Sequence, residues 1–233
     1  MTDTTAKADY LRQEVMRVAV KNKKSHIAPS LSCLDILTVL YYEQTFSEDT
    51  VILSKAHGCY GLYAIESDLG IISKEDWENF NLEATYGGLG SLGHGLPIAV
   101  GIAYGRALQG KLGHVYCVVG DGECQEGSVW EAFSFLRHYD LQNITVIIDN
   151  NGLQALDRIE DVLQHDLKKR LIGFGFDPST CNGHDHEQLL TILAYRPQVI
   201  IANTIKGYGF KFMENKPEFH ARLPDDYQTN SIR

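Results

Sequence analysis

The hydrophobic positions of the chain form short apolar runs that alternate with longer amphipathic stretches. The runs are rich in β-branched residues and predict strands buried on both faces of a sheet, at 51–53, 115–119, 144–149, 173–176 and 199–202. Apolar residues at helical spacing predict helices at 6–23, 33–43, 60–69, 74–80, 96–108, 127–138, 160–171 and 185–195. Strands that alternate with helices predict an α/β fold, with a mostly parallel sheet flanked by helices on both faces.

Capping residues indicate where two of the helices begin, and a glycine-rich segment indicates a loop. Ser32 is expected to cap the helix that begins at Cys33, and the turn 182–185 is expected to cap the helix after it. The segment 84–95 is rich in glycine, which is costly inside a regular element, so it is expected to be a loop.

Length and composition narrow the class of protein. The 233 residues are expected to form a single domain, 1–233, with an irregular tail at 207–233. A net charge of −9 argues against a nucleic-acid-binding or membrane-binding surface. The apolar runs are too short to span a bilayer, and the first residues lack the apolar core of a signal peptide. Five cysteines without a CxxC pair are typical of reduced thiols, so we expect a cytoplasmic protein.

Two oxygen-bearing side chains follow the two central strands. Asp121 follows the run 115–119 after Gly120, and Asn151 follows the run 144–149 after Asn150. Ligands of open α/β sheets bind at the carboxyl ends of the strands, where both side chains are expected. A carboxylate, an amide oxygen and a nearby carbonyl suit Mg²⁺ that also holds phosphates. Gly120 and Gly122 carry no side chains that would keep a diphosphate from the backbone.

Longer stretches of the sequence resemble one enzyme family. GDGECQEGSVWEA, followed by a helix, a strand and NNGLQ, resembles the thiamine diphosphate fingerprint of the transketolase family. Similar landmarks cover almost the whole chain: SHIAPSLSCLDILTVLY, LSKAHGCYGLYA, GSLGHGLPIAVGIA, NGHDHEQL and TIKGYGFKFMENKPEFHARLP. In that family this is the amino-terminal domain, and a separate domain binds the aminopyrimidine ring of the cofactor. The chain therefore resembles the amino-terminal subunit of a split transketolase.

The resemblance implies a set of ligands for thiamine diphosphate and a divalent cation, Mg²⁺ or else Mn²⁺ or Ca²⁺. The side chains of Asp121 and Asn151 and the carbonyl of Leu153 would bind the metal. The remaining cofactor contacts implied by the family are His57, Gly90, Leu92, Gly120, Gly122 and Glu123. Gly90 and Leu92 match the segment that touches the aminopyrimidine.

The resemblance also implies an activity and a partner. The enzyme would transfer a two-carbon ketol unit from a ketose to an aldehyde, with His26, His57 and His220 as catalytic residues. Glu126 and Glu131 match acids that couple paired active sites across the family dimer. The partner would be a pyrimidine-binding carboxy-terminal subunit in an α2β2 assembly acting on sugar substrates. The other histidines considered, His114, His138, His165, His184 and His186, are expected to be exposed or structural.

The segments that recognise sugars depart from the family pattern. The stretch before GSLG lacks the family's Gly-His-Pro segment, and His94 stands where glutamine is common. Ala28-Pro29 replaces a glycine pair or Gly-Ala, and Ala56 replaces a glycine. We therefore expect donor and acceptor sugars other than those of the pentose phosphate pathway.

Three alternatives remain open from the sequence. The first is another thiamine diphosphate reaction, either a deoxyxylulose-phosphate-synthase-like carboligation or decarboxylation by a 2-oxo acid dehydrogenase subunit. The second is a non-catalytic subunit that keeps the fold and binds a partner. The third is an unrelated nucleotide-binding α/β domain, although the chain has no complete P-loop motif, GxxxxGK[ST].

Overall fold

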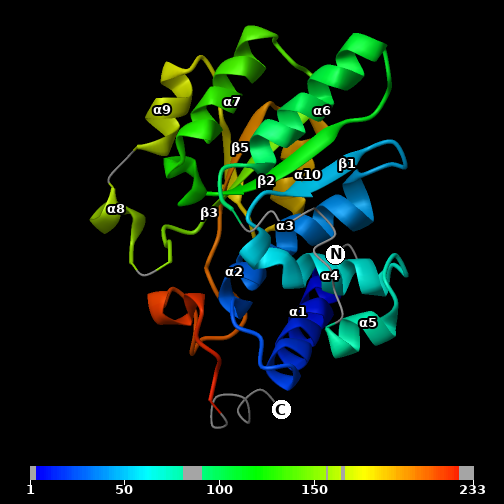
Figure 1. Ribbon diagram of the computed structural model, residues 1–233, viewed down its shortest axis with the longest axis vertical. Coiled ribbons are helices and arrows are strands. Elements are labelled where there is room, and N and C mark those ends of the chain that lie inside the picture. Colours follow the sequence, from blue (N-terminus) through cyan, green and yellow to red (C-terminus); the bar gives the residue numbers. More distant parts are fainter. Residues whose placement is uncertain (1–3, 81–90, 156, 164–165, 226–233) are drawn as a thin grey trace.

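Five parallel strands form one sheet at the centre of the computed structural model, which describes residues 4–80, 91–155, 157–163 and 166–225. Their order across the sheet is β1-β2-β3-β5-β4 (Figure 1). The bounds are β1 Thr50–Leu53, β2 Val115–Gly120, β3 Ile144–Asn150, β4 Ser179–Asn182 and β5 Val199–Asn203. The prediction of an α/β fold with a parallel sheet is therefore confirmed.

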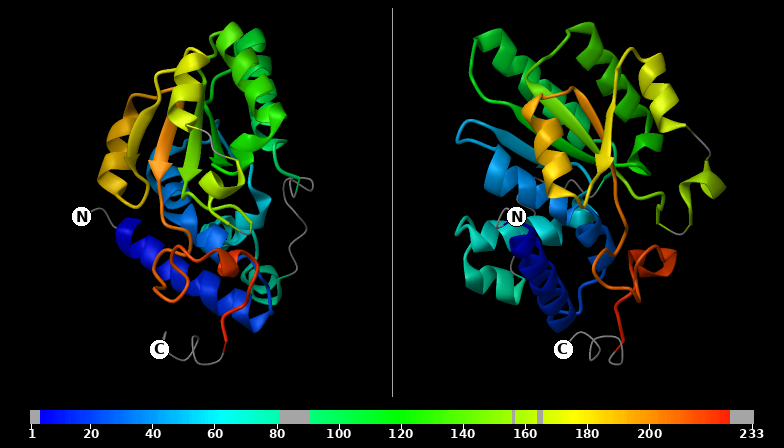
Figure 2. Two further views of the ribbon diagram at one scale, coloured as in Figure 1. Left: turned by 90° about the vertical axis from the view of Figure 1, so that its left-hand side faces the viewer. Right: turned by 180° about the vertical axis from the view of Figure 1, so that it is seen from behind.

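Helices cover both faces of this sheet, as the two views of Figure 2 show. One face packs against α1 (Thr4–Lys21), α2 (Ile27–Ser32), α3 (Leu34–Val39), α4 (Cys59–Asp68) and α10 (His186–Ala194). The other packs against α6 (Gly95–Gln109), α7 (Gly127–His138) and α9 (Leu167–Gly173). The short helix α5 (Lys74–Asn79) contacts α4. Among the described helices, none has the length and apolar character needed to cross a membrane.

Alternation along β2 explains why the strands are apolar throughout. Tyr116 and Val118 belong to the core beneath α1–α4, whereas Val115, Cys117 and Val119 belong to the core beneath α6 and α7. Because successive side chains point to opposite faces, a strand covered on both sides needs apolar residues at every position. All six residues of β2 are buried accordingly.

The helix predicted over 33–43 is confirmed in its extent, but its cap and the segment before it were predicted wrongly. The segment before Cys33 is itself the helix α2, and α3 continues into a π-helical turn at Leu40–Gln44. Ser32 is the last residue of α2 and caps no helix. Its buried hydroxyl instead donates to Asp149 Oδ1 over 2.8 Å, a hydrogen bond that the charge of the carboxylate strengthens.

The stretch 160–176 also differs from expectation. It holds two short helices, α8 (Ile159–Val162) and α9, instead of one continuous helix. The strand predicted at 173–176 is absent from this described segment, because the helix α9 ends there and Gly175 takes a φ of 88°. The strand lies further on, as the polar edge strand β4. Asp185 does cap α10, by accepting from the backbone N–H of Gln188.

His114, directly before β2, gives the fold a pH-dependent stability. Its Nε2 lies 2.9 Å from Thr145 Oγ1, and that hydroxyl donates to the Pro197 carbonyl, so the imidazole is the donor in the first contact. Burial, with the nearby charge of Arg196, lowers the pKa of His114 to about 4. The unfolded chain binds this proton with an ordinary pKa near 6.5, so acid favours unfolding as the pH falls from about 6.5 towards 4.

We expect His114 to reduce the free energy of unfolding by about 2 kcal/mol between pH 7 and pH 5. Urea unfolding of the wild-type chain and of His114→Gln at both pH values measures this contribution. The variant should lose less stability on acidification than the wild-type chain. Equal losses in the two proteins would contradict the assignment, because the other histidines are unchanged.

Candidate functional site

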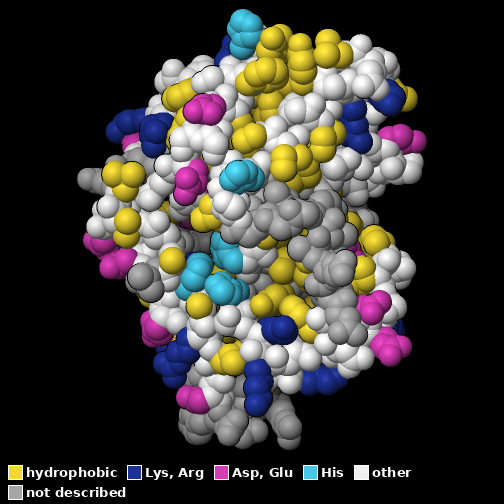
Figure 3. Space-filling view, in the orientation of Figure 1, with side chains coloured by type: hydrophobic (Ala, Val, Ile, Leu, Met, Phe, Trp, Pro, Cys, Tyr) yellow, Lys and Arg dark blue, Asp and Glu magenta, His cyan; other side chains and the backbone are white. Residues whose placement is uncertain are grey.

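A cavity of about 360 Å³ lies at the carboxyl ends of the central strands, where the sequence predicts the site. Figure 3 shows a cluster of histidine side chains along a hollow of the surface. Polar residues from distant parts of the sequence line the cavity, among them His26, Lys55, His57, Asp121, Asn151, Gln154, Lys206 and His220.

Asp121 and Asn151 both line this cavity, and Asp121 ties their loops together. Asp121 Oδ2 accepts from the backbone N–H of Gly152 over 2.6 Å, and its Oδ1 accepts from Gly122 over 2.8 Å. Asn151 donates through Nδ2 to Ser32 Oγ at 3.0 Å, while its Oδ1 accepts from the Leu153 N–H at 3.0 Å. The side-chain orientation of Asn151 is therefore fixed from both ends, with its amide oxygen on the side of Leu153.

The carboxylate of Asp121 is buried without a charged partner in its hydrogen bonds. Its described donors are the backbone N–H groups of Gly122 and Gly152. Burial and the nearby charge of Asp149 raise the pKa of Asp121 to about 7, although those N–H groups and Lys55 act in the opposite direction. A buried anion of this kind gains most from a cation bound beside it.

Lys55 and Asp149 form a buried ion pair beneath the site. The Lys55 ammonium contacts Asp149 Oδ2, and the two side chains are 2% and 0% exposed. Burial opposes ionisation of both groups, but their mutual attraction raises the pKa of Lys55 and lowers that of Asp149. Asp149 also accepts from the hydroxyls of Ser32 and Thr204. Because Ser32 in turn accepts from Asn151, this buried cluster orients the Asn151 amide.

Lys206 brings a second buried ammonium group to the cavity wall. Its Nζ donates to the carbonyls of Leu153 and Gln154, at 3.3 and 3.0 Å. Burial and the neighbouring charge of Lys55 lower the pKa of Lys206 to about 8. The Leu153 carbonyl, which is expected to bind a metal ion, therefore accepts a hydrogen bond from Lys206 in this structure.

Three histidines from three distant segments meet at the mouth of the cavity. His220 lies 5.2 Å from both His26 and His57 between ring centroids, and the other two rings lie 6.2 Å apart. Burial, followed by nearby lysine charges, lowers the pKa of His57 to about 2 and that of His220 to about 4. The pKa of His26 is lowered by burial and by Lys206. Neutral imidazoles at pH 7 can both donate and accept hydrogen bonds.

The other residues expected at the site occupy varied positions. Leu92, Gly120 and Gly122 line the cavity, as does Glu123. The Glu123 carboxylate accepts from the backbone of Gly93 and Gly120 and from the Ser54 hydroxyl, so it joins three loops. Gly90 and the positions 81–89 before it lie outside the described residues.

The two glutamates expected to couple paired active sites lie at the surface. Glu126 is exposed at the amino end of α7 and also borders the cavity. Glu131 is exposed one turn further along the same helix. Phe135, four residues on, is 39% exposed and contacts Tyr104 of α6. Glu131 therefore stands beside an exposed aromatic group.

Sequence reasoning missed four polar residues of the site: Lys55, Asp149, Gln154 and Lys206. Lys55 follows β1 and Lys206 lies just beyond β5, so both obey the strand-end rule that identified Asp121. That rule was applied only to oxygen-bearing side chains, which suit a metal, and not to basic ones, which suit phosphate. Asp149 lay hidden inside an apolar strand.

A second cavity of about 560 Å³ lies on the other side of the Asp121 loop and shares Asp121 with the first. Its remaining charged residues have mixed signs: Arg158, Glu160, Asp166 and Lys168. The first cavity fits a diphosphate better, because two buried lysines and three histidines face it.

The first cavity also holds hydrogen-bonding groups that lack partners. Gln154 Nε2 and His220 Nδ1 are buried and have no hydrogen-bond partner among the described residues. The Gln154 amide N–H fits a ligand rich in acceptor oxygens, as a diphosphate is, and so does His220 in the tautomer with a proton on Nδ1. Within the described residues, no three His, Cys, Asp or Glu side chains cluster as a metal site. The set of Asp121, Asn151 and a carbonyl fits a cation that takes its other ligands from the diphosphate.

Comparison with known proteins identifies the family. A family model described as "Transketolase, thiamine diphosphate binding domain" matches residues 5–231. One subunit of the apulose-4-phosphate transketolase of Actinobacillus succinogenes is 32% identical, over 94% of this chain and 90% of that protein. The subunit of the same name from Phocaeicola vulgatus is 29% identical, over 91% and 86%.

Solved structures agree with these relatives. Transketolase from Campylobacter jejuni matches with a TM-score of 0.87 at 25% identity, over 98% of this chain and 42% of the other. Transketolase from Leishmania mexicana matches in fold with a TM-score of 0.89 at 22% identity, over 99% and 41%. The chain thus spans most of each apulose-4-phosphate transketolase subunit but only about two-fifths of these solved transketolases. It belongs to the family of transketolase thiamine diphosphate-binding domains.

Proposed function

We propose that the chain is the diphosphate-binding subunit of a two-component transketolase-like enzyme. The enzyme transfers a two-carbon ketol unit from a ketose donor to an aldehyde acceptor. The observation that carries this proposal is the cavity in which Asp121 and Asn151, two buried lysines and three neutral histidines converge. When bound, thiamine diphosphate supplies the nucleophilic carbon and the electron sink for breaking the bond between C2 and C3 of the donor.

Different residues of the chain bind the divalent cation, the diphosphate and the aminopyrimidine ring of the cofactor. Asp121, Asn151 and the Leu153 carbonyl hold the divalent cation, which we propose to be Mg²⁺. Lys206, His57, Gln154 and the backbone around Gly120–Glu123 face the diphosphate oxygens. Leu92 and Gly90 would contact the aminopyrimidine, while the group that activates this ring comes from the partner protein.

We assign proton transfer and hydrogen bonding to the substrate to the three histidines. Lowered pKa values keep His57 and His220 neutral at pH 7, so each ring has a nitrogen free to accept a proton. The negative charge of a bound diphosphate would raise both pKa values and strengthen either imidazole as the base for the donor's C3 hydroxyl. An imidazole N–H of His26 or His57 would donate to the substrate carbonyl oxygen as negative charge develops there. Their ring separations of 5.2 to 6.2 Å leave these groups around one small opening.

The partner is a pyrimidine-binding chain, and we propose an α2β2 assembly with the single domain 1–233 as the α chain. The two relatives that are themselves named as subunits of a transketolase support a separate partner. An exposed apolar face supports packing against a second copy of this chain. It is made of Ile98 and Leu108 on α6, Phe135 on α7 and Tyr139 directly after α7, and the last two contact the ring of the half-buried Tyr104. Glu131, four residues before Phe135, borders that face, and Glu126 lies at the start of the same helix, from where the two acids would couple the active sites.

The donor we propose to test first is a ketose phosphate outside the pentose phosphate pathway. Two relatives carry the name of apulose-4-phosphate, which makes this sugar the first candidate. The altered sequence before GSLG supports a changed donor or acceptor. Five free cysteines, none in a disulfide, support a reducing cytoplasmic location.

A binding experiment tests the site itself. Magnesium pyrophosphate is titrated into the isolated chain in a calorimeter, and the titration is repeated with pyrophosphate and excess chelator. We expect binding that requires the metal, because the pyrophosphate is held partly through Mg²⁺. Binding of equal strength with and without the metal would contradict the proposed site.

A donor experiment tests the reaction class. The chain is mixed with its pyrimidine-binding partner and offered either a ketose phosphate with an aldehyde acceptor or pyruvate. We expect loss of the ketose and no release of carbon dioxide from pyruvate. Consumption of pyruvate would favour the decarboxylating or deoxyxylulose-type alternatives. Failure to take up cofactor with the partner present would favour a non-catalytic role.

A further inference from the structure

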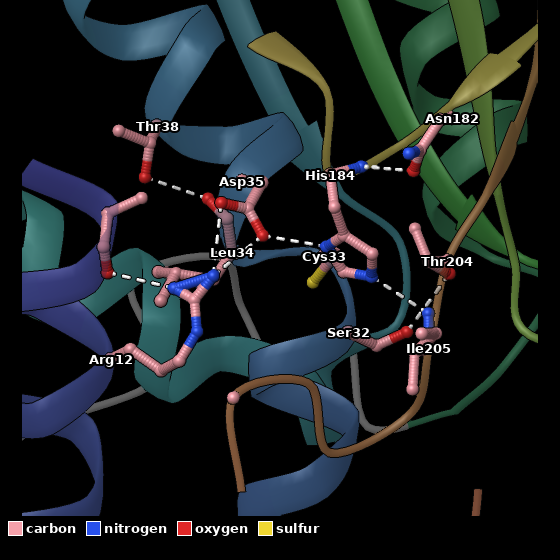
Figure 4. A network of polar contacts seen from close by, with 12 residues as sticks. Arg12, Ser32, Cys33, Leu34, Asp35, Thr38, Asn182, His184, Thr204 and Ile205 are labelled. Atoms are coloured by element: carbon pink, nitrogen blue, oxygen red, sulfur yellow. Dashed lines mark hydrogen bonds and ion pairs between the residues drawn. The ribbon is translucent and has the colours of Figure 1, made fainter. Parts of the chain in front are cut away.

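A buried cluster behind the site connects three helices and one turn through Asp35 of α3. Figure 4 shows Asp35 between Arg12 and His184. Arg12 of α1 donates to both Asp35 oxygens, at 3.1 and 2.9 Å. His184, in the turn after β4, contacts Asp35 Oδ2 at 2.7 Å, and His186 of α10 contacts Oδ1 at 3.0 Å. The four side chains are 3% to 5% exposed. Burial opposes ionisation of Asp35, but these donors lower its pKa below the usual value.

The contacts of His184 define which ring nitrogen carries its proton. Its Nε2 accepts from the backbone N–H of Ile205 at 2.8 Å, so Nε2 has no proton of its own. The proton is therefore on Nδ1, which donates to Asp35. Asp35 thus selects the tautomer in which His184 can hold the Ile205 backbone.

Residues of the same cluster, His184 and Arg12, also pack against Tyr208 and Gly209 in the segment 204–209. The His184 ring stacks on Tyr208 with centroids 3.6 Å apart and planes inclined by 16°. The Arg12 guanidinium lies 4.8 Å from the Tyr208 ring centre. A Cβ atom on Gly209 would lie 2.1 Å from Arg12 Cδ, so the Arg12 stem packs directly on this backbone.

The segment 204–209 contributes two side chains to the site, those of Thr204 and Lys206. Thr204 donates to Asp149 and lies 3.2 Å from Ser32 Oγ, and Ser32 contacts Asn151. Lys206 reaches the Leu153 and Gln154 carbonyls at the cavity wall. Ile205, whose backbone His184 holds, lies directly between these two residues.

We propose that His184 is a positioning residue that acts through Lys206. By holding the Ile205 N–H and stacking on Tyr208, it fixes the backbone from which the Lys206 ammonium reaches the diphosphate position. Its task is indirect, since its own ring contacts the Asp35 cluster and the 204–209 segment and does not line the cavity. The inference rests on the proposed function, in which Lys206 faces a diphosphate.

A matched pair of amide variants separates the two hydrogen bonds of His184. Asparagine can place an N–H near the position of Nδ1 and keep the donor to Asp35, but it is too short to reach Ile205. Glutamine can place an acceptor oxygen near the position of Nε2. The affinity for magnesium pyrophosphate is measured by calorimetry for His184→Asn and His184→Gln. Both are also made in a Lys206→Met background, and exchange of the Ile205 amide is followed in each.

We expect His184→Asn to weaken pyrophosphate binding about tenfold and to speed exchange of the Ile205 amide. His184→Gln should stay within about threefold of the wild-type affinity. In the Lys206→Met background, His184→Asn should change the remaining affinity by less than about twofold, since its effect passes through the lysine. If His184→Asn does not fold cooperatively, Tyr208→Leu removes the ring contacts with His184 and Arg12, keeps the hydrogen bonds of His184, and should weaken binding in the same Lys206-dependent way.

Either of two results would overturn the inference. One is unchanged pyrophosphate affinity and unchanged Ile205 exchange in a folded His184→Asn chain. The other is a tenfold loss that persists in full without Lys206. Failure of the wild-type chain to bind pyrophosphate would count against the proposed function instead. In that case, slow and unchanged exchange of the Ile205 amide in His184→Asn would still refute the proposal that His184 holds the Ile205 backbone.

Discussion

Asp121→Asn is expected to weaken binding of magnesium pyrophosphate by at least about 100-fold, because it removes the one carboxylate among the proposed metal ligands. The asparagine amide has nearly the same shape and can still accept from the backbone N–H of Gly122 or Gly152. Since burial already raises the pKa of Asp121, loss of its charge should not unfold the chain. Calorimetry and thermal unfolding of the same sample measure both effects.

Asn150→Ala is the matched control for this experiment. Asn150 is the last residue of the strand that precedes Asn151, but its side chain donates to Asn203 and lines the other cavity. Its replacement should leave pyrophosphate affinity within about threefold of the wild-type value. If a folded Asp121→Asn chain binds magnesium pyrophosphate as tightly as the wild-type chain, Asp121 is not a metal ligand.

Lys55→Met is expected to lower the free energy of unfolding by about 3–5 kcal/mol. The substitution leaves Asp149, which is fully buried, without its cationic partner. A buried carboxylate deprived of its counter-charge costs far more than an exposed one, because water cannot replace the partner. Urea unfolding at pH 7 measures the loss, and the double variant Lys55→Met with Asp149→Asn should recover part of it.

A surface ion pair provides the comparison for Lys55. Lys169 and Asp166 lie 3.0 Å apart at the start of α9, with side chains 83% and 49% exposed. Lys169→Met should change stability by less than about 1 kcal/mol, since solvent screens this pair. Equal losses for Lys55→Met and Lys169→Met would show that the buried pair does not stabilise the fold as described.

The sheet could be predicted because each central strand is covered on both faces. That requirement produces uninterrupted apolar runs such as Val115–Val119, which stand out in any sequence. The edge strand β4 could not be predicted in this way, because Ser179, Thr180 and Asn182 are polar and at least partly exposed, which leaves only Cys181 buried. The helix α2 was missed because it is six residues long and contains Pro29.

The site was predictable only where one local rule applied. Asp121 and Asn151 follow adjacent strands, so their position at the sheet edge follows from topology. The meeting of His26, His57 and His220 depends on three segments far apart in sequence, and resemblance to a family was needed to group them. His184 was expected to be exposed or structural, and its hydrogen bond to Ile205 became visible only with the folded chain.

Ketol transfer by the chain with and without its partner tests the central claim most directly. The chain, Mg²⁺ and thiamine diphosphate are incubated with a ketose phosphate and an aldehyde, and the pyrimidine-binding partner is added to a second sample. The account predicts no turnover above background in the first sample and sustained transfer in the second, with a native mass that corresponds to two copies of each chain. Full turnover by the isolated chain would contradict it.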